Sequence, residues 1–496
     1  MSLVTPSRIL DIFAEAYLVG GALRDAVLKK PFRDIDLAVP HSADFPARAR
    51  RLARVLGASC FALDEENQVY RLAGRKQPSF QLDIAPFQGG SLNADLRRRD
   101  FTINALALKL ERATALTQDK KSGAFTLRPE RNKIIDLGGG LKDAAAGLIR
   151  PSSAEVFRED PLRLLRAVRI AAGLDFSITP SAIKAIKAQA GLITTSAPER
   201  VREEIMRLLE SPESHRWLAL LHKAGLLCAV FPELSAQETC AVEYYGEGGV
   251  LKHTLRVVER LDHFCANLPA YLPEHKKISA LLPPARTLKF AALLHDVAKP
   301  PKAAVINGRL RFFGHEECGA TMAEAIMERL RFSREDLRLV TKIIGTHLRP
   351  GNLASNDFIS DRAMFRFFRT MGEYTIPLLA LSWADHSSYV TPAQLKRMKG
   401  RLDELPAPVP PGGLPYNSPI KTLRFMQTLH LLFRVYATKN PNLLTTRLVN
   451  GKDVITTLKI PESPRVGEIL ETMRLLQFKG EVTNRAQALK ALKGMR

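Results

Sequence analysis

Three short stretches near the start of the chain, GGALRD at residues 20–25, RDIDL at 33–37 and RRRDFTINALA at 97–107, decide most of the fold. In the second stretch, Asp34 and Asp36 flank Ile35 within an apolar run that predicts a short strand. Side chains alternate along a strand, so both carboxylates point to one face. Because Mg²⁺ prefers hard oxygen ligands, the pair predicts a Mg²⁺ site. The alternative is a solvated acidic pair at a strand edge.

The first stretch predicts a phosphate-binding turn. Leu18 and Val19 have the pattern of a strand end, and Gly20 and Gly21 open a helix. Glycines let backbone N–H groups approach a phosphate, and a helix N-terminus favours negative charge. Arg24, one turn into this helix, adds a guanidinium suited to phosphate. An ordinary strand-to-helix turn is the alternative explanation.

A third carboxylate is expected on a neighbouring strand. The segment 80–85 alternates around Asp83, which then faces away from Leu82 and Ile84. An acid in such an apolar setting needs a partner, and a metal ion would serve. A solvent-facing strand residue is an equal alternative on the pattern alone.

These blocks together resemble the class II tRNA nucleotidyltransferase and bacterial poly(A) polymerase family, within the polymerase β superfamily. Later blocks at 134–143, 157–167 and 199–205 follow in the order of that family. The resemblance implies an α/β, polymerase β-like nucleotidyltransferase head followed by all-α domains. It also implies that Asp34 and Asp36 hold the catalytic Mg²⁺ ions, with Asp83 as the third carboxylate.

The resemblance extends to a set of residues expected to bind the incoming nucleotide, ATP or CTP. The set comprises Gly20, Gly21, Arg24, Arg99, Asp100, Asn104, Asp160 and Arg163. Asp160 and Arg163 are three residues apart, so on the helix we expect there they share a face. Asp accepts hydrogen bonds and Arg donates them, which suits the amino donor and ring-nitrogen acceptor of cytosine or adenine. The alternative is a salt bridge within the helix.

Composition favours a large protein that binds a polyanion. The chain has 496 residues, a formal net charge of +22 and 46% hydrophobic residues. Such a length predicts several domains, and the charge favours RNA, read through its shape and backbone. The five cysteines show no paired spacing, which is typical of a reducing cytosol. No secretory pattern and no apolar run of 18 residues occurs, so we expect a cytoplasmic protein without a membrane partner.

Breaks in the pattern predict five segments. We expect a nucleotidyltransferase head at 1–145, a helical neck that binds RNA and nucleotide at 146–238, and a second helical domain at 239–400. A Pro-rich linker at 401–416 and a basic helical tail at 417–496 follow. The tail has 14 Lys and Arg residues and five Asp and Glu residues, so we expect it to contact RNA. The sequence leaves the oligomeric state open.

Histidines and aspartates recur through the second helical domain in the order that HD metal-dependent phosphohydrolases show. The set comprises His253, His295, Asp296, His315, His347 and Asp385. Its resemblance to that family implies a site for Mg²⁺ or a divalent transition metal that activates water on a phosphate. His295 and Asp296 are adjacent, so they can converge only from a helix end or an irregular segment. Hydrogen-bonded core histidines are the alternative.

The leading hypothesis is an enzyme that adds C and A to tRNA 3′ ends by a two-metal mechanism. Enzymes that add only CC, only A or a poly(A) tail to another RNA share the head motifs and remain open. An alternative of another class is a phosphohydrolase that acts through the HD domain while the head delivers RNA. A catalytically silent RNA-binding protein is disfavoured by the intact Asp34, Asp36, Arg99 and Asp100.

Overall fold

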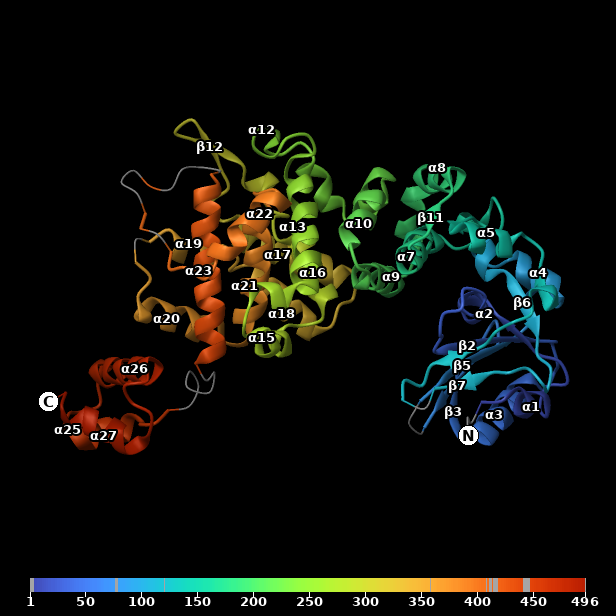
Figure 1. Cartoon of the computed structure of the whole chain (residues 1–496), viewed down its shortest axis with the longest axis horizontal. Helices are drawn as coiled ribbons and strands as arrows, with labels where there is room; N and C mark the ends of the chain where they lie inside the picture. Colours follow the sequence, from blue (N-terminus) through green and yellow to red (C-terminus); the bar gives the residue numbers. More distant parts are fainter. Residues whose placement is uncertain are drawn as a thin grey trace. The chain divides into compact units, whose positions relative to one another are not determined.

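The computed structural model (Figure 1) describes residues 4–75, 79–119, 121–356, 358–406, 408–409, 413, 418–439 and 447–495. The chain divides into two compact units, one of Met1–Glu204 with Leu220–Val230 and one of Ile205–Ala219 with Phe231–Arg496. The first unit therefore joins the predicted head to most of the predicted neck. Part of the predicted Pro-rich linker (407, 410–412 and 414–416) lies outside the described residues.

The first unit is built on a seven-stranded mixed sheet of order β3-β4-β5-β2-β1-β6-β9. Its strands are β3 (Ala58–Asp64), β4 (Val69–Gly74), β5 (Gln81–Pro86), β2 (Asp34–Val39), β1 (Tyr17–Val19), β6 (Leu106–Lys109) and β9 (Ile134–Asp136). Among the described strands of this sheet, only the β2–β5 pair is parallel. The α/β head predicted from the sequence is confirmed.

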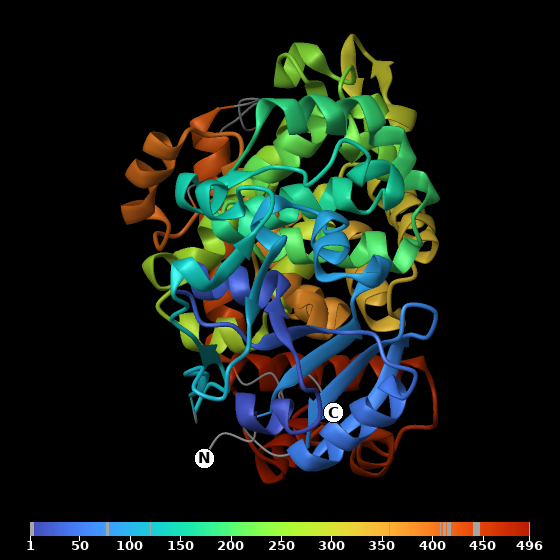
Figure 2. The ribbon, with the colours of Figure 1, turned by 90° about the vertical axis from the view of Figure 1, so that its right-hand side faces the viewer.

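The two faces of this sheet differ, and the difference positions the carboxylates. Ile35, Leu37 and Val39 of β2 are buried in the main core together with α3 (Phe45–Leu56), which Figure 2 shows against the blue strands. The intervening residues of β2 point to the opposite face, where Ala38 joins a smaller apolar cluster and Asp34 is exposed. Because side chains alternate along a strand, β2 contributes to the main core on one face, and on the other face it leaves polar carboxylates beside a small second core.

Helices surround and follow the sheet in the first unit. They are α1 (Pro6–Leu10), α2 (Gly20–Val27), α4 (Leu92–Arg97), α5 (Gly140–Ala146), α6 (Val156–Glu159), α7 (Arg163–Leu174), α8 (Pro180–Gln189), the first part of α9 (Pro198–Glu210) and α11 (Leu226–Val230). Helix α2 begins directly where β1 ends, as the Gly20–Gly21 pattern predicts.

The second unit is helical, as predicted. Its larger part comprises α13 (Gly249–Ala266), α15 (His275–Leu281), α16 (Ala285–Leu294), α17 (His315–Arg329), α18 (Arg334–Ile344), α19 (Arg349–Ala354), α20 (Asp361–Met371), α21 (Thr375–Ser387) and α23 (Pro419–Thr438). Helices α16 and α21 both pack on α13, and α23 packs on α19 and α21. The predicted tail boundary at 417 thus precedes a helix that belongs to this bundle.

A small three-helix group with its own core ends the chain. It comprises α25 (Gly451–Leu458), α26 (Pro464–Lys479) and α27 (Arg485–Lys493) around Val454, Met473 and Leu492. No helix among the described residues is long and apolar enough to cross a membrane.

Candidate functional site

Strand pairing gathers the three carboxylates predicted for the head. β2 and β5 run parallel with Asp36 opposite Asp83, and Asp34 lies two residues before Asp36 on the same face. Leu82 and Ile84 are fully buried on the other face, so Asp83 points away from them as predicted. Asp83 also accepts two hydrogen bonds of 2.7 Å from Arg71 of the neighbouring strand β4. No motif marks Arg71 in the sequence, because its role depends on the β4–β5 register.

The electrostatics of Asp36 fit a cation at this edge. Burial, together with the charges of Asp83 and Asp34, raises the pKa of Asp36 to about 6 even though Arg99 acts in the opposite direction. Carboxylates crowded on one face repel one another, and a divalent cation held by hard oxygen ligands relieves that repulsion. The donor set therefore fits Mg²⁺, with Asp34 and Asp36 as the residues that would hold it.

The turn between β1 and α2 lies in close contact with the Asp36 carboxylate. Gly20 has φ +66°, and a Cβ there would lie 2.7 Å from Asp36 Oδ2 and 3.2 Å from Arg99 Nη1. The Gly21 N–H donates to Asp36. Only glycine combines this left-handed backbone with so close an approach. Gly20 is thus required by the site itself as well as by the turn.

Three of the six residues predicted to bind the nucleotide in the head form one hydrogen-bonded chain. Arg24 Nη1 donates to Asn104 Oδ1 at 3.0 Å, and Asn104 Nδ2 donates to Asp100 Oδ1 at 2.9 Å. Arg166 of α7 reaches Asp100 at 3.5 Å. Arg99 pairs with Asp95 at 2.9 Å. These contacts fix the orientation of Arg24 and Arg99 next to the Asp36 face.

The prediction that Asp160 and Arg163 share a face of one helix is wrong. Helix α6 ends at Glu159, Asp160 has an extended backbone (φ −145°, ψ 99°), and α7 begins at Arg163. Pro161 is the cause, since a residue before proline is disfavoured in the α-helical region. Asp160 pairs with Arg200 at 3.0 Å. Arg163 instead donates to the Arg98 carbonyl oxygen at 2.9 Å and pairs with Glu159 at 3.2 Å, outcomes that spacing alone could not predict.

The six residues predicted for the HD site converge in the second unit. They form two groups whose ligand atoms lie within 4.8 Å of one another, His253 with His295 and Asp385, and Asp296 with His315 and His347. Helix α16 ends at Leu294, so the adjacent His295 and Asp296 reach the site from a helix end, as expected. His253 Nε2 lies 3.3 Å from Asp296 and 3.2 Å from Asp385, which joins the two groups.

Hydrogen bonds on the far side of each imidazole orient the rings. The Nδ1 atoms of His295, His315 and His347 lie 2.8, 2.7 and 2.7 Å from backbone carbonyl oxygens. Each Nδ1 therefore carries the proton, and Nε2 is left as an acceptor that faces the centre.

Most of the atoms that face the centre have no hydrogen-bond partner among the described residues. Within the part of the chain that the structure describes, His253 Nε2, His295 Nε2, Asp296 Oδ1 and Asp385 Oδ1 are buried without a hydrogen-bond partner, whereas Asp296 Oδ2 meets the Lys299 ammonium. Burial and the neighbouring His295 lower the pKa of His347 to about 3, which keeps it neutral. Burial would raise the pKa of Asp296, but His295 and Lys299 outweigh it and hold that pKa well below its usual range. A neutral imidazole beside ionised carboxylates fits a divalent metal ion.

Lys299 is a charged neighbour of this centre that the sequence motifs do not identify. Its Nζ lies 2.6 Å from Asp296 Oδ2 and donates to the Tyr245 hydroxyl at 2.9 Å. The Tyr245 ring stacks on His253 with 4.9 Å between centroids. Only its spacing of about one helical turn from Asp296 could have identified Lys299 in the sequence.

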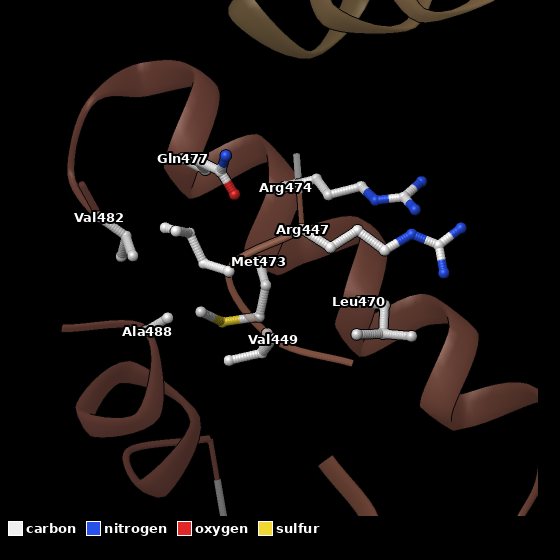
Figure 3. Close-up of a pocket in the computed structure, with 9 residues that line it drawn as sticks. Arg447, Val449, Leu470, Met473, Arg474, Gln477, Val482 and Ala488 are labelled. Carbon is white, nitrogen blue, oxygen red and sulfur yellow. The ribbon is translucent and has the colours of Figure 1, made fainter. Parts of the chain in front are cut away.

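The tail carries two adjacent arginines. In Figure 3, the guanidinium groups of Arg447 and Arg474 lie side by side at the rim of a small pocket whose floor includes Met473 and Val482. Burial and the positive charges of Arg447 and Arg369 lower the pKa of Arg474, whereas Glu471 acts in the opposite direction. Two converging guanidiniums favour a phosphate between them.

Comparison with known families matches successive parts of the chain. Residues 16–150 match "Poly A polymerase head domain", residues 175–238 match "Probable RNA and SrmB- binding site of polymerase A", and residues 250–389 match "HD domain". These matches and the two sites define an RNA nucleotidyltransferase that carries an HD domain.

Relatives extend over nearly the whole chain. An A-adding tRNA nucleotidyltransferase of Deinococcus radiodurans is 30% identical over 94% of this chain and 92% of its own. A CC-adding tRNA nucleotidyltransferase of Geobacter sulfurreducens is 29% identical over 96% and 91%. The chain belongs to the tRNA nucleotidyltransferase family.

Solved structures share the fold. A CCA-adding enzyme with CTP superposes with a TM-score of 0.60 at 19% identity, covering 97% of this chain and 91% of that one. The Thermotoga maritima CCA-adding enzyme complexed with tRNA gives 0.56 at 17% identity, covering 99% and 93%.

Proposed function

We propose that this protein adds C, A or both to the 3′ end of tRNA, using CTP and ATP and a Mg²⁺-dependent transfer centred on Asp34 and Asp36. The observation that carries the proposal is the parallel β2–β5 pair, which sets Asp36 beside Asp83 under the Gly20 turn. Relatives named as A-adding and CC-adding tRNA nucleotidyltransferases support the substrate.

The chain's own residues have separable tasks in this transfer. Asp34 and Asp36 would hold Mg²⁺, which supplies charge neutralisation for the triphosphate and alignment of the RNA 3′-OH with the α-phosphorus. The N-terminus of α2 and the oriented Arg24 favour the negative charge of the triphosphate. The 3′-oxygen then forms the bond to the α-phosphorus while the bond to pyrophosphate breaks.

Base choice would fall to Asp160 and Arg163, which lie at the break between α6 and α7. Both side chains are partly exposed, 25% for Asp160 and 17% for Arg163. A bound cytosine or adenine would replace the Arg200 and Glu159 partners with its own donor and acceptor. Arg200 is therefore a further residue of this proposed pocket.

The test of this function offers three RNAs to the purified protein: tRNA lacking CCA, tRNA lacking only the terminal A, and an unstructured RNA. Each is supplied with labelled CTP or ATP, and products are resolved at single-nucleotide length. Incorporation on either tRNA but not on the unstructured RNA supports the proposal. Long A tracts on the unstructured RNA would instead assign poly(A) synthesis.

A second activity is favoured by the buried HD centre. We propose that the six ligands hold one or two divalent ions, which would supply an activated water for attack on a phosphoester. The orphaned Nε2 and carboxylate oxygens support this assignment. Metal analysis of the purified protein and hydrolysis of 2′,3′-cyclic nucleotides test it. If the purified protein contains no divalent metal and hydrolyses no cyclic nucleotide, the HD domain lacks this activity.

A further inference from the structure

The head has a second cationic feature, at the opposite end of α2 from the carboxylates. A hollow of about 370 Å³ is lined by Ala26, Val27, Lys29, Arg128, Pro129, Arg131 and Ile134. Ala26 and Ile134 are buried and form part of an apolar floor, while the three cationic side chains are exposed around it. Nothing in the proposed transfer uses these residues.

The three cations around the hollow are not balanced by any ion pair among the described residues. No ion pair joins Lys29, Arg128 or Arg131 to a carboxylate in the part of the chain that the structure describes. Glu130, between the two arginines in sequence, is instead paired with Lys133 at 3.2 Å. Three like charges around one hollow repel each other unless an anion is bound there.

Helix geometry explains only one of these cations. Lys29 follows the C-terminus of α2, where a positive charge is favoured by the helix dipole. Lys29 also has φ +57°, a left-handed backbone conformation that favours glycine. This position therefore carries a charged side chain despite the backbone strain. Arg128 and Arg131 come from a separate segment just before β9 and lie outside any such helix effect. Their convergence with Lys29 requires another cause.

We propose that this hollow binds a backbone phosphate of the RNA substrate a few nucleotides upstream of the 3′ end. Helix α2 starts at the Gly20 turn beside Asp36 and ends at Val27 in the hollow. At a rise of about 1.5 Å per residue, the two sites lie about 10 Å apart along the helix. A stacked strand that rises about 3.4 Å per nucleotide covers this distance in about three nucleotides. The apolar floor would pack against the sugar of the same nucleotide.

The proposal rests on the proposed function for the identity of the ligand, and its test is separate because it measures binding without nucleotides. The test variant combines Lys29→Asn, Arg128→Gln and Arg131→Gln, since Asn tolerates a left-handed backbone. The matched control removes three exposed arginines from α3, Arg50→Gln, Arg51→Gln and Arg54→Gln. Both variants lose the same charge from the same domain, and unfolding curves confirm that each is folded.

Fluorescence anisotropy measures the Kd for tRNA lacking CCA at several salt concentrations. We expect the hollow variant to bind about tenfold more weakly at low salt, with a salt slope smaller by about 1 for each phosphate that the variant no longer neutralises. The control should change far less. Equal weakening of both variants, or no weakening of the hollow variant, overturns the proposal.

Two further arms identify the source of the phosphate. Neutral methylphosphonate linkages, placed one at a time in the last five positions of the RNA, should weaken wild-type binding at one linkage but leave the hollow variant unchanged there. If the hollow variant instead raises the KM for CTP or ATP with normal RNA affinity, the ligand is a free nucleotide and the RNA assignment is wrong. Failure of the wild type to incorporate nucleotides would contradict the proposed function while leaving this binding result intact.

Discussion

Replacing Gly20 with alanine should disable nucleotide transfer far more than it destabilises the head. Gly20 has φ +66°, so alanine there costs about 1–2 kcal/mol in backbone strain. The new Cβ would lie 2.7 Å from Asp36 Oδ2. To reach an ordinary separation of about 3.3 Å, the carboxylate must move by about 0.6 Å. Because a misplacement of about 1 Å costs about a hundredfold in rate, we expect a loss of incorporation of roughly 10- to 100-fold.

Gly57 provides the matched control for this prediction. It ends α3 with φ +63°, and a Cβ there would meet nothing within 4 Å. Gly57→Ala should therefore lose the same stability, measured by urea unfolding, and keep its activity. The assay is labelled CTP or ATP incorporation on tRNA by both variants. Rates of the two variants within threefold of each other would refute the reasoning about the Asp36 contact.

Further predictions concern pH, the HD centre and the tail. The pKa of Asp36 is raised from 3.8 to about 6 in the folded protein. In metal-free buffer, the contribution of Asp36 to the free energy of unfolding is therefore full below about pH 4 and is lost as the pH rises through 6. Asp36→Asn should remove this pH dependence from the unfolding curves. Asp296→Asn should lower the metal content and abolish phosphoester hydrolysis while tRNA extension persists, and loss of both activities in a folded protein would contradict independent sites. Arg447→Gln with Arg474→Gln should weaken tRNA binding several-fold and reduce its salt slope by about 1 for each phosphate left without its arginine, whereas an unchanged Kd would exclude the arginine pair from the RNA surface.

Local pattern predicted the parts of the fold that depend on local physics. The alternation through Ile35 placed Asp34 and Asp36 on one face because a strand has a period of two. The HD ligands could be recognised by their order along the chain, and the end of α16 before His295 followed from the need of adjacent side chains to converge.

The residues whose roles could not be predicted from the sequence depend on contacts between segments that are distant along the chain. Arg71 meets Asp83 only through the β4–β5 register. Arg128 and Lys29 line one hollow only because the segment before β9 packs near the end of α2. The prediction for Asp160 failed for a local reason, because a spacing of three residues does not capture the restriction that Pro161 places on the residue before it.

The measurement that tests the central claim most directly compares the wild type with Asp36→Asn, following tRNA extension and HD-dependent hydrolysis in parallel. If the β2 carboxylates perform the transfer, the variant should lose extension by more than a thousandfold while hydrolysis, in the other unit, is unchanged. Extension within tenfold of the wild type, a barrier change of only about 1.4 kcal/mol, would contradict the assignment of the active site.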